Sequence, residues 1–180
     1  PQPSPPVVSV SSPAGSPYQT IHSVDHHYVL VSSEEQMRSL IEKLSAQKEF
    51  CFDTETTGLD VHHDTLVGMS FCYKEHEAFF VPVDSDFHKG KQVVSLFKPL
   101  FENPSIAKTG HNLKFDMMML KRYGIEVEGT LFDTLIAHYL LQPEQNHKMD
   151  ALSRSYLNYQ PVAIEELIGE KGKHQRNMRD

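Results

Sequence analysis

The sequence predicts an α/β fold in which helices flank a mixed β-sheet. Short runs rich in β-branched and aromatic residues occupy much of the first 110 residues, and stretches with apolar residues at helical spacing lie between and after them. Strands followed by helices are typical of a layered α/β domain. Three strand-like runs between residues 50 and 83 follow one another through short polar connections. We therefore expect these three strands to be antiparallel neighbours.

The globular pattern starts near residue 28, where the first strand is predicted. The next segment, 32–35, is Ser-Ser-Glu-Glu, which supplies a cap and first-turn acids for a helix. The Asn103-Pro104 pair ends the helix that precedes the strand predicted at 106–110. In chain order we expect strands at 28–31, 50–55, 66–73, 78–83 and 106–110, and helices at 37–44, 91–101, 115–123, 132–141, 149–157 and 164–168.

Composition limits the class of protein. At 180 residues the chain has the size of one domain with a tail. Residues 1–24 are rich in Pro and Ser, so we expect a linker or disordered arm there and a folded domain over 25–180. The net charge of −7 argues against binding nucleic acid through a general basic surface. No apolar run approaches the roughly 18 residues of a membrane span, which favours a cytoplasmic protein without a membrane partner.

The two cysteines, Cys51 and Cys72, both lie in strand-like runs. Apolar surroundings of this kind indicate buried, reduced thiols rather than a disulfide framework. The chain also begins at Pro1 without an initiator Met, so we expect a fragment of a longer protein.

Two carboxylates end the strand that begins at Phe50. Asp53 and Glu55 are two residues apart, so on an extended strand they point to one face while Thr54 points to the other. Carboxylate oxygens are the ligands that Mg²⁺ prefers. The alternative is a strand ending in a polar turn with both acids solvated, and this segment alone does not separate the two interpretations.

A second acidic motif lies about 60 residues further on. In the segment 110–120, Asp116 falls in the first turn of an apolar helix. It is a candidate third ligand, but an acid there also complements the helix dipole without binding anything.

Together the two segments resemble the DEDD superfamily of 3′-5′ exonucleases. The order of shorter motifs is similar to that of the proofreading domain of bacterial, family A DNA polymerase I, and the resemblance covers about 28–176. The motifs are Phe-Asp-Thr-Glu-Thr-x-x-Leu-Asp at 52–60, Asn-Leu-Lys-Phe-Asp at 112–116, Tyr-Gly-Ile at 123–125, Phe-Asp-Thr at 132–134, Met-Asp-x-Leu at 149–152 and Gly-x-x-Gly-Lys-x-Gln at 169–175. This resemblance implies a ribonuclease H-like fold.

The resemblance also implies a chemistry. Asp53, Glu55 and Asp116 match three of the family's four metal-binding carboxylates, which are its catalytic residues. The complete family site uses two Mg²⁺ ions, with Mn²⁺ or Zn²⁺ as substitutes, to hydrolyse the terminal phosphodiester. The implied substrate is a single-stranded or frayed 3′ end of DNA, and the implied partner is a polymerase domain of the same polypeptide. Matching positions suggest substrate contacts at Thr54, Leu59, Asn112 and Lys114.

The family's third motif, Tyr-x-x-x-Asp, does not occur in the sequence. Asp133 matches a structural position of the family rather than a ligand. We therefore expect a domain without its C-terminal part and with weak or no activity. Two alternatives stay open, namely an RNA exonuclease related to ribonuclease D and a non-catalytic DNA-binding or spacer domain of a polymerase.

Overall fold

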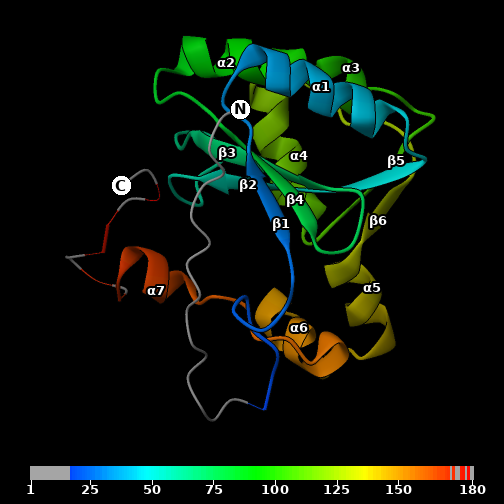
Figure 1. The fold of residues 1–180 in the computed structure, drawn as a ribbon, viewed down its shortest axis with the longest axis vertical. Coiled ribbons are helices and arrows are strands. Elements are labelled where there is room, and N and C mark those ends of the chain that lie inside the picture. Colours follow the sequence, from blue (N-terminus) through cyan, green and yellow to red (C-terminus); the bar gives the residue numbers. More distant parts are fainter. Residues whose placement is uncertain (1–16, 171, 173–174, 177, 179–180) are drawn as a thin grey trace, which may run out of the picture.

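The computed structural model describes residues 17–170, 172, 175, 176 and 178 (Figure 1). The greater part of the predicted N-terminal arm, residues 1–16, lies outside them. Six strands form one sheet in the order β1-β4-β3-β2-β5-β6. Their bounds are β1 His27–Leu30, β2 Glu49–Thr56, β3 Leu66–Cys72, β4 Glu77–Pro82, β5 Ala107–Gly110 and β6 Leu131–Asp133.

The centre of the sheet is the predicted antiparallel meander. Strand β3 pairs antiparallel with both β2 and β4, which confirms the expected arrangement. Strand β1 joins β4 in parallel, β5 joins β2 in parallel, and β6 joins β5 in parallel. The sheet is therefore mixed, as predicted, and α4 connects the parallel pair β5 and β6.

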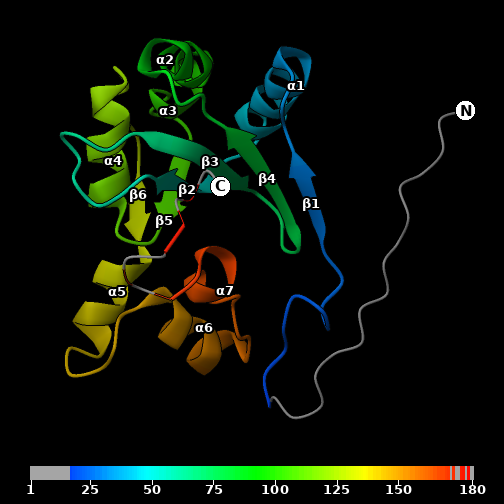
Figure 2. The ribbon, with the colours of Figure 1, turned by 90° about the vertical axis from the view of Figure 1, so that its left-hand side faces the viewer.

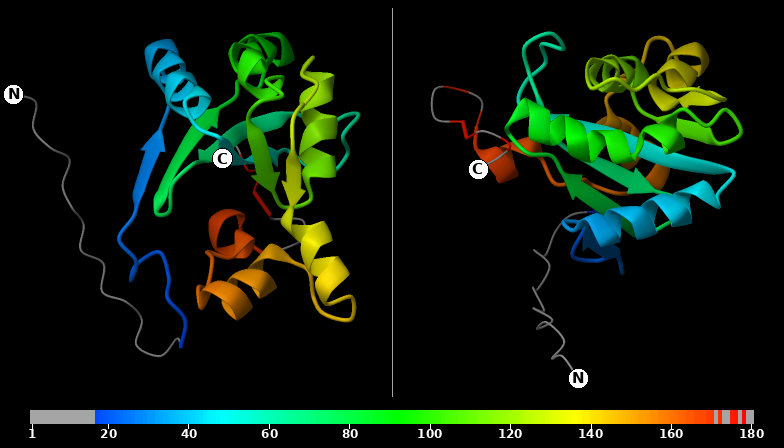
Figure 3. Two further views of the ribbon diagram at one scale, coloured as in Figure 1. Left: turned by 90° about the vertical axis from the view of Figure 1, so that its right-hand side faces the viewer. Right: turned by 90° about the horizontal axis from the view of Figure 1, so that it is seen from above.

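Seven helices accompany the sheet in the described part of the chain. They are α1 Glu34–Ser45, α2 Phe87–Leu96, α3 Lys98–Phe101, α4 Leu113–Arg122, α5 Thr134–Leu141, α6 Met149–Leu157 and α7 Ile164–Ile168. In Figures 1 and 2, α1 to α3 lie on one side of the sheet and α6 and α7 on the other. The right-hand view of Figure 3 shows the sheet and α1 from above.

Two predicted boundaries were wrong. The helix expected over 91–101 is two helices that meet at Phe97, with a proline at the start of α3. Proline cannot continue the backbone hydrogen bonding of the preceding helix. The helix expected from 132 starts at Thr134, because Leu131–Asp133 pairs with β5 as a short strand.

The core lies between the sheet and α1 to α4. Phe52 packs edge-on against Phe101 with ring centroids 5.0 Å apart, and Phe71 stacks on Phe97 at 5.2 Å. The side chains of Phe50, Phe52 and Thr54 are buried, and they alternate along β2 with exposed or half-buried ones. Strand geometry therefore directs Asp53 and Glu55 to the sheet face opposite this core.

The same alternation corrects the prediction for the cysteines. Cys51 lies between Phe50 and Phe52 and is exposed, and Cys72 is only partly buried. An apolar neighbourhood in the sequence did not imply burial here, because neighbouring residues of a strand face opposite ways.

The last helices pack loosely. Neither α6 nor α7 contains a buried residue, and α5 contains only His138. Gln19, within the predicted N-terminal arm, forms an isolated parallel bridge with Tyr159, so the described end of that arm contacts the C-terminal part. Among the residues that the structure describes, no helix combines the length and apolar character that crossing a membrane requires.

Candidate active site

The two sequence motifs meet where β5 leaves β2. Strand β5 accompanies β2 only from Glu49 to Cys51 and ends at Gly110. The chain then turns through Asn112, whose φ of 66° is left-handed, and enters α4. The second half of β2 therefore has no strand on that side, and α4 packs against it.

Asp116 of α4 occupies this vacated edge. Its Oδ1 accepts a hydrogen bond from the backbone N–H of Thr54 at 2.9 Å and another from the Thr54 hydroxyl at 2.6 Å. The Asp116 side chain is buried, with 2% of the residue exposed. Its position is thus decided by a tertiary contact with β2 rather than by the dipole of its own helix.

Burial raises the pKa of all three carboxyl groups, and repulsion by the other two adds to this at Asp53. Burial, followed by the charges of Asp116 and Glu55, raises the pKa of Asp53 from 3.8 to about 7. Burial also raises the pKa of Glu55 and, against the two hydrogen bonds from Thr54, that of Asp116. Among the residues that the structure describes, the groups that lower these pKa values include no cationic side chain.

The carboxyl groups fit a hard divalent cation in their chemistry. Oxygen ligands with excess negative charge are what Mg²⁺ and Mn²⁺ bind. The side chains do not yet enclose an ion, since the described residues contain no group of three or more His, Cys, Asp or Glu close enough to hold a metal. Asp53 and Glu55 share a face of β2, and Asp116 accepts hydrogen bonds from Thr54, the residue between them.

The predicted substrate contacts lie around this group in different settings. Leu59 is 88% exposed on the loop after β2, where Asp64 accepts hydrogen bonds from the Thr57 hydroxyl and the Asp60 N–H. Asn112 and Lys114 are exposed at the start of α4. The Thr54 hydroxyl is buried against Asp116. These four roles remain predictions.

Asp133 is a positioning residue that sequence reasoning assigned only a structural role. The Asp133 carboxylate accepts hydrogen bonds from the N–H groups of Asn112 and Leu113 at the start of α4, at 3.0 and 2.8 Å. It also accepts from Leu135 and Ile136 at the start of α5. The place of Asp133 before Thr134 is a helix-cap signal in the sequence. The second helix that Asp133 binds, α4, starts 20 residues earlier, at Leu113.

Gly68 is a further residue that the sequence did not single out. It lies opposite Glu55 in the β2–β3 register. A Cβ atom at this position would come within 2.2 Å of the Phe80 ring. Glycine therefore leaves room for the Phe80 ring beside the acidic strand.

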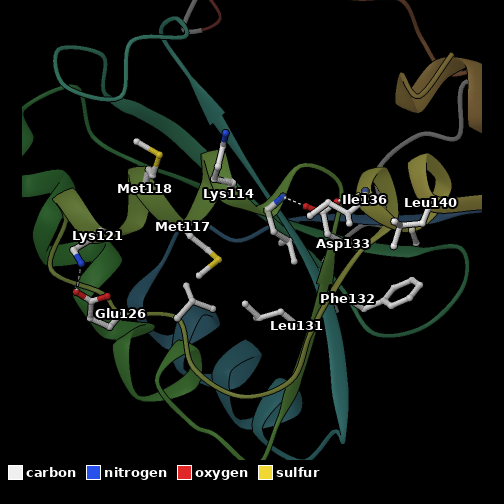
Figure 4. Close-up of a pocket in the computed structure, with 13 residues that line it drawn as sticks. Lys114, Met117, Met118, Lys121, Glu126, Leu131, Phe132, Asp133, Ile136 and Leu140 are labelled. Carbon is white, nitrogen blue, oxygen red and sulfur yellow. Dashed lines mark hydrogen bonds and ion pairs between the residues drawn. The ribbon is translucent and has the colours of Figure 1, made fainter. Parts of the chain in front are cut away.

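A cavity lies on another side of α4. It has a volume of about 620 Å³ and opens between α4, β6 and α5 (Figure 4). Met117, Leu131 and Ile136 contribute to its apolar wall, and Lys114 and Asp133 also line it. None of the three clustered carboxylates lines this cavity.

Comparison with protein families identifies the chain. The family model for the 3′-5′ exonuclease domain matches residues 28–179. DNA polymerase I of Borreliella burgdorferi is 33% identical over 156 residues, which is 83% of this chain and 17% of that protein. DNA polymerase I of Chloroflexus aurantiacus is 35% identical over 150 residues, 80% of this chain and 16% of that protein. The chain thus spans about a sixth of the length of these relatives.

Solved structures share the fold. NrnC of Brucella melitensis with bound Mg²⁺ has a TM-score of 0.59 at 19% identity, covering 78% of this chain and 65% of that one. The catalytic core of RRP6 from Trypanosoma brucei has a TM-score of 0.63 at 20% identity, covering 87% and 40%. These matches place the fold among ribonuclease H-like exonucleases, as the sequence predicted. Fold, motif order and family match agree, and the chain belongs to the family of 3′-5′ exonuclease domains found in DNA polymerase I.

Proposed function

We propose that Asp53, Glu55 and Asp116 bind divalent metal and that this domain removes nucleotides from the 3′ end of DNA. The observation that carries the proposal is that the charges of Asp116 and Glu55 act on Asp53 in the second half of β2, in a chain of this family. The proposed ions are two Mg²⁺, with Mn²⁺ or Zn²⁺ as substitutes. When bound, such ions supply an activated water and stabilise the leaving oxygen of the phosphodiester.

The protein's own residues prepare the site for a negatively charged substrate. Without metal, Asp53 and Glu55 would repel a phosphate, so the acids bind DNA only after their charge is offset. Thr54 holds Asp116 at the strand edge through two hydrogen bonds. Asp133 anchors the start of α4, from which Asp116 projects. Leu59, Asn112 and Lys114 are the proposed contacts to the terminal nucleotides.

The proposed setting is that of the relatives. A single-stranded or frayed 3′ end is the proposed substrate, and a polymerase domain of the same polypeptide is the proposed partner, in the cytoplasm. One solved structure with this fold, Pol1 of M. smegmatis, is complexed with a DNA primer-template. Sequence relatives at 30–35% identity are DNA polymerases, which favours DNA over the RNA substrate of a ribonuclease D-like enzyme.

A nuclease assay tests the proposal. The protein in excess over a 3′-labelled single-stranded DNA, with Mn²⁺ or Mg²⁺, should release labelled mononucleotide slowly, because the sequence carries no Tyr-x-x-x-Asp motif. We expect Asp53→Ala to reduce this rate at least about 100-fold, since even residues that only support metal ligands can cost 10 to 100-fold. Glu42, an exposed residue of α1, provides a matched control, and Glu42→Gln should leave the rate of nucleotide release unchanged.

Metal binding provides a readout that does not depend on turnover. Titration with Mn²⁺ should show binding to the wild-type protein and at least about tenfold weaker binding to Asp53→Asn. Equal Mn²⁺ affinity of the two proteins would refute the metal assignment. An RNA of the same base sequence degraded faster than the DNA would replace the proposed substrate with RNA, and Mn²⁺ binding without any cleavage would favour the non-catalytic alternative.

A further inference from the structure

The two cysteines lie opposite each other in the sheet. Cys51 of β2 and Cys72 of β3 are direct partners in the antiparallel register. Directly opposed residues project to the same face, here the face that carries Asp53 and Glu55. They are also the only cysteines of the chain. The sheet therefore pairs the two thiols two residues before the acidic end of β2.

Antiparallel geometry brings this pair within the reach of a disulfide. Opposed Cα atoms are about 4.5 or 5.5 Å apart, and disulfides join Cα atoms about 4.4 to 6.8 Å apart. The Thr54 N–H points away from β3 to Asp116. Because inter-strand hydrogen bonds alternate, Cys51 and Cys72 form a hydrogen-bonded pair with the wider spacing.

The wider spacing determines what kind of disulfide would form. The Cβ atoms of such a pair are about 5 Å apart. This is farther than the 3.5 to 4.5 Å between the Cβ atoms of an ordinary disulfide. Closing the bond requires the two strands to move together slightly. A bond formed under such strain is more readily reduced than a structural disulfide.

Both thiols have the access that exchange requires. Cys51 is exposed, and Cys72 is partly exposed with its Sγ donating to the carbonyl oxygen of Lys74 at 3.2 Å. A thiol must be reachable from solvent to exchange with a small disulfide, and both cysteines meet this condition.

We propose that Cys51 and Cys72 are a reversible redox modification site, in which a small disulfide such as oxidised glutathione closes a cross-strand disulfide beside the carboxylate group. One cysteine thiolate attacks a sulfur of oxidised glutathione and releases one glutathione thiolate. The second cysteine thiolate then attacks the mixed disulfide and releases the other glutathione. The protein loses two electrons and two protons, and both glutathione molecules leave reduced. This proposal does not depend on nuclease activity.

Intact-mass measurement tests it. The folded, reduced protein is incubated in glutathione buffers of graded redox potential and quenched with an alkylating agent. Its intact mass is then measured by mass spectrometry. The expected product is a monomer that carries no alkyl groups and is about 2 Da lighter than the reduced chain, as loss of two hydrogens requires. Dithiothreitol should restore two alkylatable thiols.

Two matched variants and one condition make the result decisive. Cys51→Ser and Cys72→Ser should each give only the single glutathione adduct, without the lighter species. In urea the wild-type chain loses its register, and the disulfide should need a more oxidising buffer there than in the folded protein. The proposal is overturned if the folded wild type yields only mixed disulfides or intermolecular dimers, or if urea makes closure easier.

Discussion

The two halves of β2 have opposite environments. From Glu49 to Cys51 the strand pairs with β5, β3 joins it on the other side from Cys51 onward, and Phe50 is buried in the aromatic core. From Asp53 onward β3 remains, but the place of β5 is taken by the Asp116 carboxylate. One continuous strand thus serves first as core and then as the support of an acidic group.

The difference shows how the end of a β-strand becomes a polar site at a cost in stability. A backbone N–H left unpaired in the interior would cost about 1 to 3 kcal/mol, so the strand edge vacated by β5 needs an acceptor. Asp116 provides it and at the same time brings a third negative charge to Asp53 and Glu55. The first half of β2 stabilises the fold. The second half lowers this stability, because negative charges repel one another there. Three substitutions at neighbouring positions test this contrast.

The largest change in stability is expected at Phe52, the last core residue of the first half of β2. Phe52→Ala should lower the free energy of unfolding by about 3 to 5 kcal/mol, since it leaves a cavity against Phe101. Urea denaturation measures the change. As a control, Phe132→Ala on β6 removes a side chain that is 54% exposed and should cost below about 1 kcal/mol. Equal losses would mean that the two positions are equally packed.

Asp53→Asn should act in the opposite direction. The pKa of Asp53 is raised to about 7 in the folded protein from 3.8, so the folded state binds the proton more tightly than the unfolded one. Wild-type stability should therefore fall as pH rises from about 4 to 7 and level off above. At pH 8 without divalent metal the variant should be more stable by about 2 to 4 kcal/mol.

Urea denaturation across this pH range measures the slope for both proteins. Exposed Glu35 of α1 offers a control, and Glu35→Gln should retain the wild-type slope. Wild-type stability that rises between pH 4 and 7 would contradict the proposed repulsion among the three acids. Adding Mn²⁺ should narrow the difference between wild type and Asp53→Asn, because metal binding stabilises only the folded state that carries its ligands.

The smallest effect is expected at Thr54. Thr54→Val removes the hydroxyl that donates to Asp116 and leaves the backbone hydrogen bond in place. We expect a loss of about 1 to 2 kcal/mol in the free energy of unfolding. Thr54→Ser keeps the hydroxyl donor and should lower the free energy of unfolding by less than Thr54→Val does. A stable Thr54→Val protein with unaltered Mn²⁺ affinity would show that the hydroxyl is not needed to place Asp116.

Much of this arrangement was predictable from local patterns. Period-two alternation on β2 correctly placed Asp53 and Glu55 on one face and Thr54 on the other. The short connections predicted the antiparallel meander. The errors arose where several signals compete within a few residues, as at Asp133, which ends β6 and also caps α5. The exposure of Cys51 could have been inferred from the same alternation that placed the carboxylates.

The sequence by itself determined the α/β class, the order of the central strands and the family, because periodicity and motif order are local properties of the chain. Only the tertiary structure decided which groups meet. The Thr54 hydrogen bonds to Asp116, the raised pKa of Asp53, the double cap by Asp133 and the pairing of Cys51 with Cys72 all depend on register and on where β5 ends. Such contacts join residues 20 to 60 positions apart, and their strength comes from burial, which a local pattern does not specify.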